Sequence, residues 1–155
     1  MTFPIKLVDA DHALSFTTQA RLCITAPQLA LGLSANPANV HAREAVTWTL
    51  TARNLALQAA DTALTVNLPF NATLVSGTLT SSANAASELS GTIKWQGILG
   101  AQAGVTLTYQ AVLPLSATKR ETYGSAIATV ADEVWQAGVW INSQPYAAYL
   151  PVLRK

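Results

Sequence analysis

The chain has 155 residues, nine of them basic and eight acidic, so its net charge is +1 and only 11% of its residues are charged. This small, balanced charge excludes a disordered acidic or basic tail, and it argues against a nucleic-acid partner, which needs clustered Lys and Arg. One Cys and two His exclude a disulfide framework and a zinc site built from the usual ligands. The length suits a single domain with an appendage.

The N-terminal segment is not expected to be a signal peptide. Asp9, Asp11 and His12 lie where a signal peptide needs an apolar run. No apolar stretch approaches the ~18 residues that span a bilayer, so we expect no membrane insertion. Low charge, little Cys and abundant Thr, Ser, Asn and Ala are typical of bacterial surface proteins. We therefore expect a segment of a larger exported protein, located at the cell surface or outside the cell.

Apolar and polar residues alternate with a period of two from the first segment onward, as in half-buried strands. Residues 14–24 and 29–33 show this pattern, and Asn36, Pro37 and Asn39 predict a turn after the second strand. Residues 45–54 alternate most clearly. Their inward side chains are expected to be Val46, Trp48, Leu50 and Ala52.

The second half of the chain continues the pattern. Strands are expected at 64–68, 72–79, 92–95, 105–113 and 123–131, and 81–91 is expected to be a loop of small residues. No window of about a dozen residues has the 3.6-residue apolar period of a helix. About seven to nine short strands separated by turn residues predict an all-β fold, an immunoglobulin-like antiparallel β-sandwich. Trp48 and Trp95 are expected in its core.

Several segments together resemble a known repeat. Residues 46–54 read Val-Thr-Trp-Thr-Leu-Thr-Ala-Arg-Asn, residues 64–69 read Leu-Thr-Val-Asn-Leu-Pro, and residues 93–95 read Ile-Lys-Trp. In order and spacing they are similar to the domain-of-unknown-function-eleven repeat of bacterial and archaeal surface proteins, over about residues 28–131. The resemblance implies an immunoglobulin-like repeat of a secreted or wall-bound protein that acts as a spacer or adhesion module.

The chain divides into three parts. Residues 28–131 are expected to form the sandwich, and residues 132–155 an aromatic-rich hairpin or tail that packs on it. Residues 1–27 are either the domain's own first strand and linker or a remnant of a preceding repeat. The pattern at 14–24 predicts a strand without deciding whether it pairs within its own domain or swaps into a partner molecule.

Metal and catalytic motifs are sparse. Asp9 and Asp11 could supply two carboxylates to calcium at a domain junction, although a solvated linker is the favoured interpretation. No Gly-x-Ser-x-Gly occurs, and neither His12 nor His41 lies in a recognisable catalytic motif. We therefore expect no cofactor and no enzyme activity.

Four aromatic residues lie close together near the C-terminus: Trp135, Trp140, Tyr146 and Tyr149. One interpretation is a platform for sugar rings, which would make the chain a carbohydrate-binding module. The favoured interpretation is a last hairpin of strands 134–141 and 146–152, joined by a turn at 142–145. Its aromatic side chains would then cover the open end of the core.

The function expected from these observations is a non-catalytic extracellular structural or adhesion module, a spacer or accessory domain of a larger protein. Its expected partners are the neighbouring domains of that protein. Few charged residues lie on its edge strands to prevent pairing with another molecule, so we also expect self-association through these edges. A polysaccharide is a further possible partner.

Overall fold

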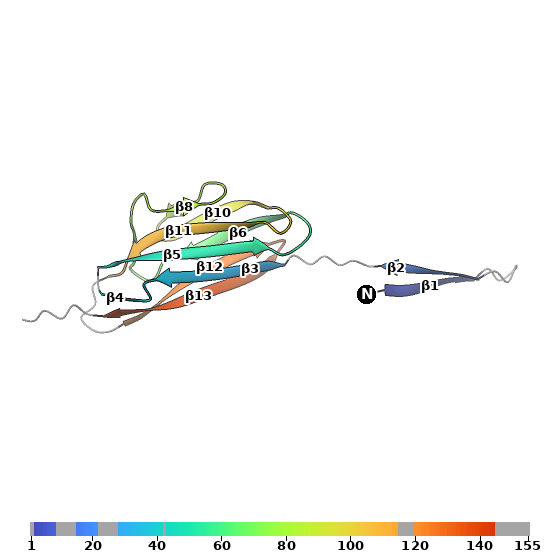
Figure 1. Cartoon of the computed structure of the whole chain (residues 1–155), viewed down its shortest axis with the longest axis horizontal. Helices are drawn as coiled ribbons and strands as arrows, with labels where there is room; N and C mark the ends of the chain where they lie inside the picture. The colour runs from blue at the N-terminus through green and yellow to red at the C-terminus, as the bar shows by residue number, and fades with distance from the viewer. Residues whose placement is uncertain (1, 9–14, 22–27, 42, 115–119, 145–155) are drawn as a thin grey trace, which may run out of the picture.

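The computed structural model describes residues 2–8, 15–21, 28–41, 43–114 and 120–144 (Figure 1). Every regular element within these ranges is a strand, so they include no helix that could span a membrane. The strands are β1 (Thr2–Val8), β2 (Ser15–Arg21), β3 (Leu29–Asn36), β4 (Asn39–His41), β5 (Ala45–Asn54), β6 (Ala60–Asn67), β7 (Thr73–Leu74), β8 (Thr80–Ser81), β9 (Ser87–Leu89), β10 (Thr92–Leu99), β11 (Gly104–Val112), β12 (Arg120–Val130) and β13 (Glu133–Gln144).

Eleven of these strands form two sheets that pack face to face. One sheet has the order β4-β13-β12-β6-β10-β9, and the other has the order β3-β5-β11-β7, with β8 also paired to β11. The β13–β4 pair is parallel, whereas the other pairs in both sheets are antiparallel. The predicted all-β sandwich is confirmed.

The core follows directly from the period-two pattern, because successive side chains of a strand point to opposite faces of its sheet. The four inward residues predicted on β5, Trp48 among them, are all buried, whereas Thr51 and Arg53 are exposed. Trp95 on β10 and Tyr109 on β11 are also buried. The prediction that Trp48 and Trp95 lie in the core is confirmed.

Two hairpins have two-residue turns that fix their register. Ser90 and Gly91 join β9 to β10, and Ala131 and Asp132 join β12 to β13. All four residues have positive φ, between 45° and 79°. Positive φ at both central residues defines a type I′ turn, whose twist matches that of the strands on either side.

Asn54 ties two loops together at the end of β5, where it is 2% exposed. Its side-chain amide nitrogen lies 2.7 Å from the carbonyl oxygen of Gln58 and 3.1 Å from those of Leu99 and Gly100. Its Oδ1 accepts a hydrogen bond of 2.9 Å from the backbone nitrogen of Ala56. One buried side chain thus satisfies backbone groups of the β5–β6 and β10–β11 connections.

Tertiary pairing changes some of the predicted boundaries. The strand expected at 72–79, with an interruption at Gly77, is present only as β7 (Thr73–Leu74). Gly77 has a φ of +77°, and β8 begins beyond the expected range, at Thr80. A three-residue strand, β4, occupies part of the turn expected after Asn36. It pairs with residues 142–144, and β13 therefore continues to Gln144, into the turn predicted at 142–145. The loop expected at 81–91 contains the last residue of β8 and the whole of β9.

The predicted strand at 14–24 corresponds to β2, which pairs with β1 over seven residue pairs, from Thr2 opposite Arg21 to Val8 opposite Ser15. These two strands form a separate two-stranded sheet, hydrogen-bonded to neither sheet of the sandwich. The assignment of residues 1–27 to this domain or to a preceding repeat stays a prediction.

The sandwich has two poles, defined here by its first and last strands. β3 begins at Leu29, opposite Asn54, at the pole with the Asn54 loops. β13 ends at Gln144, opposite His41, at the other pole. Figure 1 shows the chain entering β3 at one end of the sandwich and leaving β13 at the other.

Candidate functional site

The structure separates the two described members of the predicted aromatic cluster. Trp135 is half-buried and packs against the core, whereas Trp140 on the same strand is 61% exposed. Residues five apart on a strand lie on opposite faces of the sheet, so these rings do not share a surface. Tyr146 and Tyr149 lie outside the described residues, as do Asp9 and Asp11.

Trp140 instead faces Tyr123 on the neighbouring strand β12. The two residues are direct partners in the β12–β13 ladder, with ring centroids 4.9 Å apart and ring planes inclined by 45°. Tyr123 is 48% exposed. Its ring lies over Gly138, where an added Cβ would overlap the phenol. The result is an open aromatic pair on the outer face of the six-stranded sheet.

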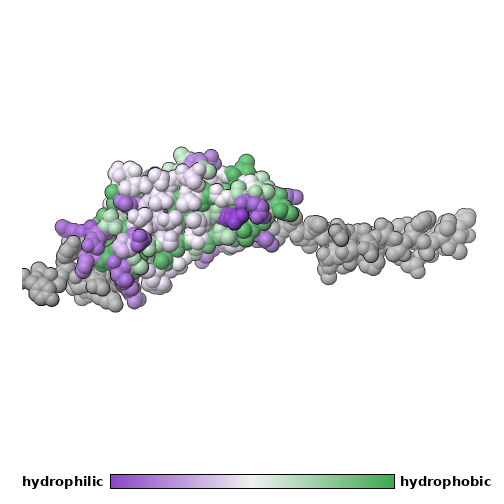
Figure 2. Space-filling model, in the orientation of Figure 1, coloured by the Kyte–Doolittle hydropathy of each residue, from purple (hydrophilic) through white to green (hydrophobic). Residues whose placement is uncertain are grey.

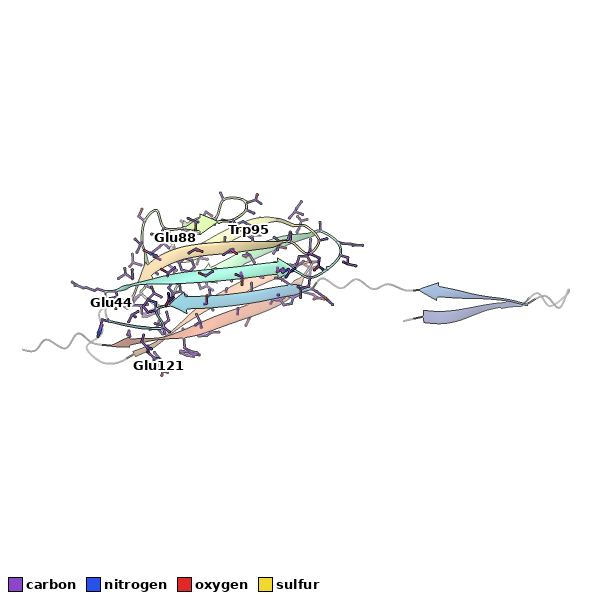
Figure 3. The ribbon with its side chains drawn as sticks, viewed as in Figure 1. Glu44, Glu88, Trp95 and Glu121 are labelled. Carbon is purple, nitrogen blue, oxygen red and sulfur yellow. The ribbon has the colours of Figure 1, made fainter. Side chains whose placement is uncertain are left out.

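Polar residues border this pair along the strands. Glu121 and Asn142 are direct partners one row beyond Tyr123 and Trp140, and Asn39 on β4 is paired with Asn142. Because residues two apart on a strand share a face, the side chains of Glu121 and Asn142 leave the sheet on the same side as the rings. The label of Glu121 in Figure 3 marks this end of the sheet. We call these five residues, Asn39, Glu121, Tyr123, Trp140 and Asn142, the aromatic platform.

A row of directly paired residues, small or polar except for the exposed Leu89 at its end, runs from the platform across the same sheet face. It crosses β13, β12, β6, β10 and β9 through directly paired residues, namely Gly138, Ser125, Asn67, Thr92 and Leu89. With strands about 4.8 Å apart, the row is about 19 Å long.

Two hollows lie at the far end of this row, on either side of Lys94. One of about 350 Å³ is lined by Ser87, Leu89, Ser90, Thr92 and Lys94. The other, of about 310 Å³, is lined mainly by residues of β6 and β10 and by Ala85 and Ser87. Lys94 is exposed, as its outward position on β10 predicts.

The outer face of the five-stranded sheet is polar but almost uncharged. Ser34, Thr49, Thr108 and Thr80 form one row of directly paired residues across four strands. Figure 2 shows this face as a broad pale surface with stronger purple patches toward its ends. The hydroxyl groups partly bond to backbone carbonyls, as Thr80 Oγ1 does to Thr108 at 3.3 Å. Threonine suits such a face because it is both β-branched and polar.

The described carboxylates are dispersed. Glu44 Oε2 accepts a hydrogen bond of 2.9 Å from the backbone nitrogen of His41, and Glu88 Oε1 accepts one of 2.7 Å from that of Gly91. Both therefore stabilise turns. Figure 3 shows Glu44, Glu88 and Glu121 on well-separated parts of the sandwich. Within the described ranges, no three or more His, Cys, Asp or Glu side chains are grouped to hold a metal ion.

Sequence reasoning found Trp140 but missed Tyr123 as its neighbour. The signal that could have shown this is the two-residue turn at 131–132. A turn at these residues fixes the register of the hairpin, in which residue 123 is paired with residue 140. It also grouped Trp135 with Trp140, although their odd spacing on one strand places them on opposite faces.

Comparison with solved structures identifies the class of fold. The chain is similar to a CARDB domain from Pyrococcus furiosus crystallised with di-metal ions, with a TM-score of 0.52, 14% identity, and coverage of 81% of this chain and 100% of that one. It is similar to BslA, a bacterial hydrophobin, with a TM-score of 0.52, 13% identity, and coverage of 77% and 96%. It also resembles the N-terminal domain of the Streptococcus gordonii adhesin Sgo0707, with a TM-score of 0.51, 9% identity, and coverage of 76% and 32%.

The chain is therefore an immunoglobulin-like β-sandwich domain. No protein-family profile matches it, and no curated protein sequence matches it. The resemblance to the domain-of-unknown-function-eleven repeat accordingly stays a prediction. At these low identities the solved structures establish the fold alone.

Proposed function

We propose that this chain is a non-catalytic module of an exported protein, acting as an in-line spacer or adhesion domain at the cell surface. The observation that carries the proposal is the position of the two poles. Because β3 starts at one pole and β13 ends at the other, domains attached before and after the sandwich lie at its opposite ends. This placement extends a multidomain chain instead of folding it back.

Three further observations support the proposal. The threonine-rich face is polar although it carries little charge, which suits a surface that meets solvent. One structural neighbour is the N-terminal domain of an adhesin, so the same fold occurs in a protein of the adhesion class. Glu44 and Glu88, which could have been catalytic acids, are occupied in stabilising turns.

The expected partners are neighbouring domains or further copies of the chain. β3 (Leu29–Asn36) has neither charge nor Pro and is hydrogen-bonded to β5 alone, but β13 of the other sheet lies beside it. The edge of β3 is therefore partly covered within the domain itself. We propose that adjoining domains or further copies meet the sandwich at its two poles.

The spacer role is tested by joining two full chains in tandem and measuring small-angle scattering. The maximum dimension of the tandem protein should be about twice that of one chain, because in-line domains add their lengths. A value close to that of one chain would show that the copies fold back side by side, against the proposal.

The absence of catalysis is tested separately on a broad panel of hydrolase substrates. No turnover above background is expected. Turnover that disappears on Glu121→Gln or His41→Ala, with folding retained, would contradict the non-catalytic assignment.

A further inference from the structure

The aromatic platform is a surface whose chemistry the spacer role does not require. A buried aromatic pair would simply add to the core, but Trp140 and Tyr123 are 61% and 48% exposed on the outer sheet face. Exposed aromatic side chains on a well-ordered sheet can contact a ligand at little cost in conformational entropy, since each has only two rotatable side-chain bonds.

The platform combines two kinds of group in adjacent rows. The rings offer apolar surface, and the next row offers the amides of Asn39 and Asn142 and the carboxylate of Glu121. A ligand that fits must present apolar faces beside hydrogen-bonding groups within a few ångströms. Pyranose rings have this character, because their C–H bonds form an apolar face and their hydroxyl groups lie around the rim.

Charge further narrows the class of ligand. On the outer face of this sheet the described charged side chains include Glu121 beside the rings, Lys94 near the hollows and Asp61 on β6. They are few, of both signs and separated, so neither an acidic nor a basic polymer meets a cluster of opposite charge. Nucleic acids, which depend on phosphate neutralisation, fit poorly for the same reason.

The row gives the site its length and direction. From Gly138 beside the rings it passes Ser125, Asn67 and Thr92 to the hollows around Lys94. Its length of about 19 Å accommodates several sugar units of one chain. Its small side chains leave room for a flat polymer, and its amide and hydroxyl groups can bond to the polymer along the way.

We propose that the outer face of the β4-β13-β12-β6-β10-β9 sheet binds a neutral polysaccharide, with its sugar rings stacked on Trp140 and Tyr123. The site differs from the cluster predicted from sequence, since Tyr123 joins Trp140 and Trp135 faces the core. The spacer function does not depend on this site, so failure of one leaves the other intact.

The test is affinity electrophoresis of the full chain in native gels containing hydroxyethylcellulose, laminarin or galactomannan. Retardation is expected in at least one of the three gels. Trp140→Ala should weaken it at least about tenfold, in line with the loss of one aromatic stacking contact and its buried area. Tyr123→Ala should weaken it in the same gel.

Val134→Ala is the matched control, because Val134 is 58% exposed on the same strand and the same face, outside the aromatic platform. It should leave the retardation unchanged, and the thermal midpoint of each variant reports whether it is folded. Should Trp140→Ala fail to fold, Trp140→Phe, which retains a stacking ring, should bind more weakly than wild type.

Three results would overturn the proposal. They are the absence of retardation in all three gels, equal effects of Trp140→Ala and Val134→Ala, and light scattering that shows a dimer dissociated by Trp140→Ala. The last result would assign the face to a second copy of this chain.

Discussion

Trp48 and Tyr109 stack on each other in the centre of the sandwich, with ring centroids 6.1 Å apart and ring planes only 2° apart. They are direct partners in the β5–β11 ladder, and both are fully buried. Neither the indole nitrogen of Trp48 nor the hydroxyl oxygen of Tyr109 has a hydrogen-bond partner in the described structure. The pair therefore stabilises the core through its packing while it leaves two polar atoms desolvated.

Replacing Tyr109 with Phe keeps the stacked ring and removes the unpaired hydroxyl. We expect Tyr109→Phe to raise the free energy of unfolding by about 1 kcal/mol, because the desolvation penalty of the hydroxyl disappears. Urea denaturation measures the change. Tyr123→Phe, at an exposed position, should change it by less than about 0.5 kcal/mol. A loss of stability on Tyr109→Phe would show that the hydroxyl has a stabilising partner.

The same burial makes stability depend on alkaline pH. Desolvation raises the pKa of Tyr109 above its ordinary value of about 10. In the unfolded chain the phenol ionises near pH 10, whereas in the folded chain it stays neutral at that pH. The contribution of the neutral Tyr109 phenol to the free energy of unfolding is therefore complete below about pH 10 and is lost as the pH rises further. Thermal midpoints between about pH 8 and pH 11 should fall more steeply for wild type than for Tyr109→Phe. Parallel declines would contradict the assignment.

Gly124 on β12 faces Trp48 across the sandwich, and a Cβ at this position would overlap the six-membered ring of the indole. Because that ring is fixed against Tyr109, Gly124→Ala should destabilise the protein by about 2–3 kcal/mol in chemical denaturation. Gly138→Ala is the control. Its Cβ would meet the exposed ring of Tyr123, which can move into solvent, so the expected loss is below about 1 kcal/mol. Equal losses of stability in the two variants would show that the core around Trp48 rearranges to accommodate the added methyl group.

Asn54 offers the sharpest test of the loop pole. Asn54→Leu keeps a side chain of similar size but leaves the backbone groups of Ala56, Gln58, Leu99 and Gly100 without this partner. We expect a loss of about 2–4 kcal/mol, as for several buried polar groups left unpaired. Asn67→Leu, on an exposed strand position, should change stability by less than about 0.5 kcal/mol. A similarly small change in stability on Asn54→Leu would show that the hydrogen bonds of Asn54 do not stabilise the fold.

Local pattern was enough to predict the core. Strands β5 and β11 each bury one face, which forces alternation in their sequences, and the inward residues predicted on β5 are the ones buried. β4 and the last residues of β13 could not be predicted in this way. Each exists because the other pairs with it, and residues 39–41 are about a hundred positions away from 142–144.

The platform was partly predictable. Trp140 stood out as an aromatic residue in a strand, but its partner depends on the register of the β12–β13 hairpin. Ala131 and Asp132, both at positive φ, form the two-residue turn that sets this register. Asn-Gly is a strong sequence signal for such a turn, whereas Ala-Asp is not. The polar neighbours Asn39 and Asn142 come together only through the parallel β4–β13 pairing.

The most direct measurement of the spacer account is single-molecule unfolding under force, with Cys23→Ser in both proteins. In the first, Gln28→Cys and Gln144→Cys provide the attachment points. Force then acts between opposite poles and loads the β3–β5 and β12–β13 ladders along their strands, so many hydrogen bonds must break together.

In the second, Gln28→Cys and Leu57→Cys place both attachments at one pole, because Leu29 is paired with Asn54. Force then peels β3 from β5 one pair at a time. We expect a clearly higher unfolding force for the pole-to-pole attachment than for the attachment at one pole. An equal or lower force in that direction would contradict a role as an in-line, load-bearing module.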